Sequence, residues 1–122
     1  MILHEQTLPF ELTNKNAGRK THWAPAYAER RVFERTIRKL GWEREPFSEL
    51  VTVTVTHILG PRQRLWDSSS IGRGNYKELE DALVACGWFV DDGPNYIDQT
   101  IFKQDDSQRH NGPAVKITIE KA

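Results

Sequence analysis

The chain has 122 residues, of which 28% are charged and 38% hydrophobic, and its formal net charge is zero. This length supports one domain with a modest core, and the composition excludes a membrane protein and extensive disorder. Its one cysteine, Cys86, excludes an internal disulfide and is typical of a reducing compartment. Residues 1–10 lack the basic and apolar regions of a signal peptide, so we expect a cytoplasmic protein.

The first half of the chain predicts a strand and then a basic helix. Residues 2–12 are rich in strand formers, and Pro9 would place this strand near a sheet edge. After a polar loop, Pro25 is typical of a helix start and Gly41 of a helix end. The apolar stripe of this helix is predicted to contain Ala26, Phe33, Ile37 and Leu40. The rest of the helix is basic, through Arg30, Arg31, Arg35, Arg38 and Lys39.

The second half predicts three further strands and one helix. Alternating valine and threonine over residues 51–59 indicate a strand with two distinct faces. A helix is predicted from Ile71 or Asn75 to Cys86, followed by the stop signal Gly87. Its apolar stripe is predicted to contain Leu79, Ala82, Leu83 and Cys86, which follow helical spacing. The last two strands are predicted over 96–103 and 114–120. We therefore expect residues 1–122 to form one α/β (α+β) domain, with a mixed sheet of about four strands and two helices in the order strand-helix-strand-helix-strand-strand.

The charges are unevenly divided along the chain. Residues 1–65 contain eleven Lys and Arg against seven acids, whereas residues 66–122 contain six against ten. This division is expected of a nuclease that holds phosphates with one part and cations with another. A solvated surface with a dipolar charge distribution would show the same division, so the charge alone does not distinguish the two.

Three aspartates flank the second predicted helix. Asp67 precedes it, and Asp91 and Asp92 follow it. Clustered carboxylates raise each other's pKa, and such a cluster usually persists because a divalent cation neutralises it. Hard oxygen ligands favour Mg²⁺, which is typical of phosphodiester chemistry. We therefore identify Asp67, Asp91 and Asp92 as candidate metal ligands.

Each of these residues also has a purely structural interpretation. Asp67, followed by three serines, suits a helix N-cap. The run from Asp91 to Pro94 has the composition of a β-turn. Lys77 and Asp81 are four residues apart and suit a surface ion pair. A lysine in the first turns of this helix could instead reach a scissile phosphate.

Four features of the chain resemble the RusA family of Holliday junction resolvases. Two are the basic loop from Asn14 to Trp23 and the basic loop of residues 60–65 after a strand. The third is Lys77-x-x-x-Asp-Ala-Leu, and the fourth is Gly87-x-x-x-Asp-Asp. The resemblance implies a homodimeric, Mg²⁺-dependent endodeoxyribonuclease that acts on branched DNA. It further implies metal binding by Asp67, Asp91 and Asp92 and a catalytic Lys77 near the phosphate. The expected DNA contacts are Asn14, Arg19, Lys20, Arg62, Arg64 and Arg73.

The chain departs from this family at one motif. The family has Asp-x-Asp-Asn shortly before its lysine, whereas this chain has Asp67-Ser68-Ser69-Ser70. Ser69 then stands in place of the second aspartate, and a neutral hydroxyl is a weaker ligand than a carboxylate. Two alternatives therefore stay open: a catalytically impaired RusA-like DNA-binding protein, and a small protein-interaction domain in which Asp91 and Asp92 form only a turn.

Overall fold

A computed structural model describes residues 1–13, 26–65 and 75–122. The predicted class and order of elements are confirmed, because two helices alternate with the strands of one mixed sheet. The elements are β1 (Ile2–Leu8), α1 (Ala26–Lys39), β2 (Val51–Ile58), α3 (Tyr76–Ala85), β3 (Ile97–Asp105), the 3₁₀ helix η1 (Arg109–Asn111) and β4 (Ala114–Lys121). Pro25 and Ile71, two predicted helix starts, lie outside the described residues.

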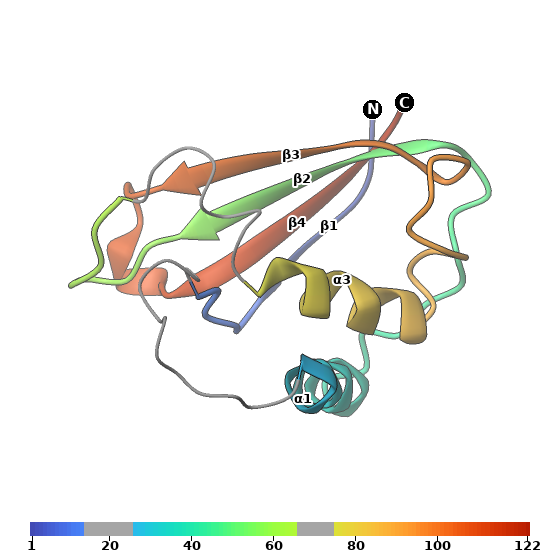
Figure 1. Ribbon diagram of the computed structural model, residues 1–122. Coiled ribbons are helices and arrows are strands. Elements are labelled where there is room, and N and C mark those ends of the chain that lie inside the picture. Colours follow the sequence, from blue (N-terminus) through green and yellow to red (C-terminus); the bar gives the residue numbers. More distant parts are fainter. Residues whose placement is uncertain (14–25, 66–74) are drawn as a thin grey trace.

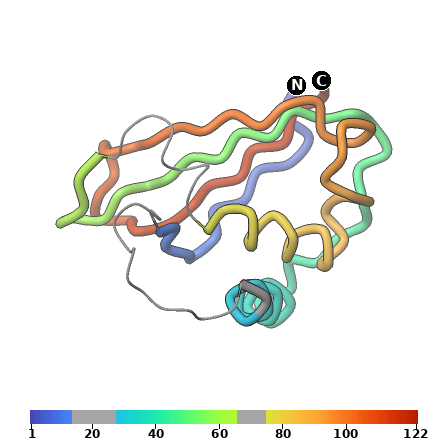
Figure 2. Tube along the Cα trace, in the orientation of Figure 1, coloured from blue at the N-terminus to red at the C-terminus, as the bar shows by residue number. Residues whose placement is uncertain are grey.

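The strands follow the order β1-β4-β2-β3 across the sheet. Strands β2 and β3 are parallel, and β4 runs antiparallel to both β1 and β2. Both helices lie on the same face of the sheet, with α3 against it and α1 further out (Figure 1). The two ends of the chain lie side by side, because β1 and β4 are antiparallel neighbours (Figure 2).

The core lies between this sheet and α3. Val51, Val53 and Val55 of the central strand β2 are completely buried, and they belong to one cluster with Leu79 and Leu83 of α3. This arrangement follows from the two periodicities, since alternate strand positions and helix positions three to four apart each form one apolar face. The predicted valine face of β2 and the predicted apolar stripe of α3 are therefore confirmed.

The predicted stripe of α1 is confirmed at Phe33 and Ile37 but wrong at Leu40. Phe33 packs against Phe10 with ring centroids 4.7 Å apart, and Ile37 is fully buried. Helix α1 ends at Lys39, and Leu40 is 45% exposed. The chain turns at Gly41, which has a positive φ, so that the partly buried Trp42 packs against the core instead.

A close backbone contact joins the segments that follow the two helices. The amide nitrogen of Arg44 donates to the carbonyl of Cys86 at 3.1 Å. At the next residue, Gly87, φ is +88°, and a Cβ built there would lie 2.0 Å from the carbonyl oxygen of Arg44. Only glycine fits here, because both the backbone conformation and the available space exclude a side chain.

Gly41 provides a matched comparison for Gly87. Both have positive φ, but a Cβ on Gly41 would have nothing within 4 Å. We expect Gly41→Ala to lower the free energy of unfolding by about 1 kcal/mol, the cost of a left-handed alanine. Gly87→Ala should cost at least about 3 kcal/mol, because backbone must also move. Urea unfolding of both variants tests this expectation, and equal losses would contradict it.

Candidate active site

Lys77 lies in the first turn of α3 and contacts three carboxylates. Its Nζ pairs with Oδ1 of Asp81 at 3.2 Å and with Oε1 of Glu80 at 3.5 Å, both on the next turn of the helix. It also forms a short ion pair with Oδ2 of Asp92, which belongs to the loop after the helix. The predicted pair of Lys77 with Asp81 is thus confirmed. The added contact with Asp92 joins two of the four features of the resemblance, the Lys77 motif and the Asp91-Asp92 motif.

The segment after α3 is positioned by buried aromatic residues. Gly87 turns the chain, and the amide nitrogen of Trp88 donates to the carbonyl of Leu83 at 2.9 Å. The side chain of Trp88 is fully buried, and its Nε1 donates to the carbonyl of Trp42 at 2.8 Å. Phe89 is buried beside it. With these anchors fixed, the following residues return along α3 until Asp92 reaches Lys77.

The turn predicted at Asp91–Pro94 lies later in the chain. The amide nitrogen of Tyr96 donates to the carbonyl of Gly93 at 3.0 Å, which places Gly93 at the first position and Pro94 at the second position of a β-turn. The turn prediction is therefore confirmed for Gly93 and Pro94. Asp91 and Asp92 precede the turn, so their side chains are not used to form it.

The pKa values around Lys77 show a compact network of charges. The hydrogen bond from Lys77 lowers the pKa of the Asp92 carboxyl, and the same contact raises the pKa of the Lys77 ammonium. Burial raises the pKa of Glu80, although the Lys77 charge opposes that shift. Burial also raises the pKa of the Tyr76 hydroxyl, and the nearby charges of Glu80 and Asp92 add to this effect. The ammonium of Lys77 is therefore the charge that stabilises the ionised form of Asp92.

Asp91 and Asp92 open onto a shallow hollow of about 340 Å³ between α1 and α3. Arg30 of α1 lines this hollow opposite the acids, although it was predicted only as part of a basic helix surface. Helical spacing predicts that Arg30 is exposed, but not which loop it faces. The full lining is Arg30, Asp81, Val84, Ala85, Asp91 and Asp92.

The other predicted site residues fall into two groups, of which the first is not described by the structure. Asp67, Asn14, Arg19, Lys20 and Arg73 lie outside the described residues.

Arg62 and Arg64 are exposed in the loop that follows β2. Ile58, the last residue of β2, pairs with Asp105 at the end of β3, whereas Asp91 and Asp92 precede the start of β3. The loop that holds Arg62 and Arg64 therefore lies at the opposite end of β3 from the two aspartates. Arg62 instead lines a separate hollow of about 350 Å³ near Pro113.

Carboxylate oxygens suit a hard cation, but the predicted set of three ligands is incomplete within the described ranges. Among residues 1–13, 26–65 and 75–122, no group of three or more His, Cys, Asp or Glu is arranged to hold a metal ion. Asp91 and Asp92 supply oxygen donors of the kind that Mg²⁺ prefers. The third predicted ligand, Asp67, lies outside the described residues, so the predicted convergence of the three acids stays a prediction. No helix in these ranges is long and apolar enough to span a membrane.

The pairing of Lys77 with Asp92 gives a pH-dependent signature. The pKa of Asp92 is lowered in the folded protein, so the pair stabilises the fold above the unfolded carboxyl pKa of about 3.9. That stabilisation is lost as the pH falls through the lower, folded pKa. In an NMR titration, Lys77→Gln should raise the pKa of Asp92, whereas Lys77→Arg should keep it low. An unchanged pKa in Lys77→Gln would show that the contact does not persist in solution.

Comparisons with known proteins do not assign a family. No protein-family model matches the chain, and no curated protein sequence matches it. Among solved structures, the chain is similar to the periplasmic domain of Helicobacter pylori MotB (residues 97–256). The TM-score is 0.38 at 14% sequence identity, over 94% of this chain and 79% of that chain. Similarity at this level indicates neither a shared family nor a shared function.

Proposed function

We propose that the chain is a Mg²⁺-dependent endonuclease of the RusA type that cleaves branched DNA. The observation that carries the proposal is the contact between Lys77 and Asp92. It brings the lysine motif next to the paired aspartates, which are distant from it in sequence. Asp81 of that motif lines a hollow open to solvent together with Asp91 and Asp92. A cation of the protein next to paired carboxylates is an arrangement suited to phosphate chemistry, because one group attracts the phosphate and the others attract its counterion.

Lys77 and Arg30 are suited to binding the scissile phosphate. The side chain of Lys77 is 60% exposed, so its ammonium can move from Asp92 to a phosphate oxygen without disturbing the helix. The guanidinium of Arg30, across the hollow, can form paired hydrogen bonds to phosphate. Both positive charges would stabilise the additional negative charge that develops on the phosphate during cleavage.

Asp91 and Asp92, together with Asp67, are the residues proposed to hold Mg²⁺. When bound, Mg²⁺ supplies a Lewis acid that polarises the phosphate and lowers the pKa of a bound water. A four-way junction requires two cuts, and one small domain offers one such site. The proposal therefore includes a two-fold homodimer, which provides the second site.

The carboxylates provide the direct test of this activity. We expect Asp91→Asn and Asp92→Asn each to lower the single-turnover rate of four-way junction cleavage in Mg²⁺ by at least about 100-fold, the equivalent of a few kcal/mol of transition-state stabilisation. Asp98→Asn is the matched control, because Asp98 is an exposed aspartate of β3. It should cleave at the wild-type rate. Full activity of Asp91→Asn and Asp92→Asn would place the active site elsewhere.

A catalytically impaired DNA-binding protein is the second candidate function. Two observations favour it: Ser69 stands where the family has its second aspartate, and Lys77 neutralises one of the proposed ligands. Such a protein would bind branched DNA but cleave it slowly or not at all. Binding and cleavage measured on the same junction separate the two candidates.

The serine run allows the missing charge to be restored. If Ser69 stands where the family has a ligand carboxylate, Ser69→Asp adds one negative charge and one strong oxygen donor. We expect this variant to bind Mg²⁺ more tightly and to cleave junctions faster than the wild type. Ser68→Asp and Ser70→Asp test the adjacent alignments. If none of the three changes alters Mg²⁺ affinity in a titration, this segment does not contribute to the proposed site.

A further inference from the structure

We infer that the outer surface of α1 binds the phosphate backbone of nucleic acid through Arg30, Arg31 and Arg35, here called the arginine face. All three side chains are exposed. Arg31 and Arg35 are four residues apart and so lie on the same side of the helix, where like charges repel each other. The helix keeps these charges together although their repulsion opposes helix formation, and a polyanion would remove that cost.

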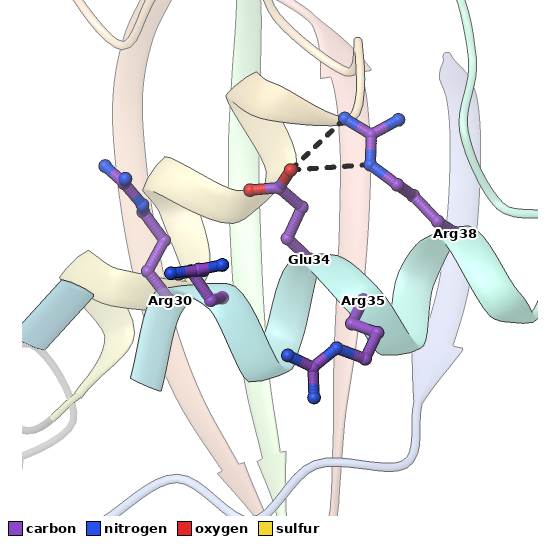
Figure 3. A pocket seen from close by; sticks show the side chains of 5 residues that line it. Arg30, Glu34, Arg35 and Arg38 are labelled. Carbon is purple, nitrogen blue, oxygen red and sulfur yellow. Dashed lines mark hydrogen bonds and ion pairs between the residues drawn. The ribbon is translucent and has the colours of Figure 1, made fainter. Parts of the chain in front are cut away.

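The described residues do not neutralise the arginine face. Arg38, on the next turn, pairs with Glu34 at 3.3 Å and Glu43 at 2.7 Å. Within the described part of the chain, no acid lies within ion-pair distance of Arg30, Arg31 or Arg35. Figure 3 shows the difference: Arg38 turns toward Glu34, whereas Arg30 and Arg35 extend away from that pair.

The arginine face is continuous with the candidate active site. A hollow of about 580 Å³ opens over this surface of α1. Arg30 lines both this hollow and the hollow that contains Asp91 and Asp92. A strand that entered the active site would therefore continue over α1. The residues that line the larger hollow are Arg30, Arg31, Glu34, Arg35 and Arg38.

Charge and shape favour a phosphate backbone as the occupant. Guanidinium groups form paired hydrogen bonds with phosphates, and they bind regardless of base sequence. The arginine face extends over five helical rises from Arg30 to Arg35, about 7.5 Å, which corresponds to roughly two phosphates along one strand. The choice of DNA over another polyanion rests on the proposed function. An acidic protein is the alternative occupant, and binding to polyglutamate in place of DNA would reveal it.

The test measures how DNA binding depends on salt. Arg31→Gln/Arg35→Gln removes two charges but keeps helix propensity, because glutamine is a good helix former. Fluorescence anisotropy with a labelled four-way junction is recorded in EDTA, which prevents cleavage. We expect the slope of log Kobs against log salt to become shallower by about 1.8, since each lost phosphate contact contributes about 0.9. At one fixed salt concentration below about 0.2 M, the variant should bind at least roughly tenfold more weakly than the wild type. Arg31→Lys/Arg35→Lys should keep the slope.

The matched control removes the same charge from the opposite side of the molecule. Lys103 and Lys116 both pair in register with Thr56, on the face of the sheet away from the helices. Lys103→Gln/Lys116→Gln should leave the slope and the affinity unchanged. Thermal unfolding of every variant checks that the fold is retained.

The outcomes separate this inference from the proposed function. If wild type cleaves junctions but the arginine variant keeps its slope and affinity, the inference is overturned and the proposed function stands. If the slope falls as expected but Mg²⁺ produces no cleavage, the inference stands and the nuclease proposal fails. If wild type binds polyglutamate and not DNA, and Arg31→Gln/Arg35→Gln abolishes that binding, the occupant is an acidic protein and the inference is wrong.

Discussion

The burial of Trp88 is the constraint on which the candidate site depends. This side chain is completely buried, and its one polar atom is satisfied by the carbonyl of Trp42. Burial of an aromatic residue of this size stabilises the fold by about 3 kcal/mol, enough to hold the segment after α3 in one place. Gly87 permits the close backbone approach that this burial requires. As a result Asp91 and Asp92 are held beside α3, although they belong to an irregular segment.

The two sides of the proposed site differ in how their charges are satisfied. On α3, the ammonium of Lys77 is shared by three carboxylates, so the free protein contains its own counterion. On α1, the arginine face has no such counterion among the described residues. An internally neutralised cluster can exchange partners without a large change in net charge. An unneutralised surface gains the most from a polyanion, because binding releases that ligand's counterions.

Local pattern was sufficient to predict the elements, because each buried face repeats with the period of its own backbone. Valines at alternate positions predicted β2, and the spacing of Leu79 and Leu83 predicted α3. The error at Leu40 arose where periodicity continued past the true helix end, and the chain turn at Gly41 placed Trp42 in the core instead. A helical pattern alone does not predict at which residue a helix stops packing against the core.

Contacts of the site were predictable between residues of one motif. Contacts between residues of separate elements were not. Lys77 and Asp81 share a helix face, so their pairing follows from spacing. The contact with Asp92 depends on how the later loop packs, which spacing along the chain does not predict. Arg30 belongs to another helix altogether, and its place at the hollow follows from the packing of α1 against α3.

A net charge of zero is compatible with strong local attraction for DNA. Charges at a surface are screened within about 8 Å at physiological ionic strength, so an approaching strand responds to the nearest groups and not to the total. Arg31 and Arg35 are one turn apart on the same side of one helix, and Arg30 precedes them directly, so these neighbouring charges act on the same part of an approaching strand. Beyond them, the acids around Lys77 repel a backbone that lacks a cation. The fold thus places an attractive surface next to a site that DNA would enter favourably only with its counterion, and Arg30 lies at the boundary between them.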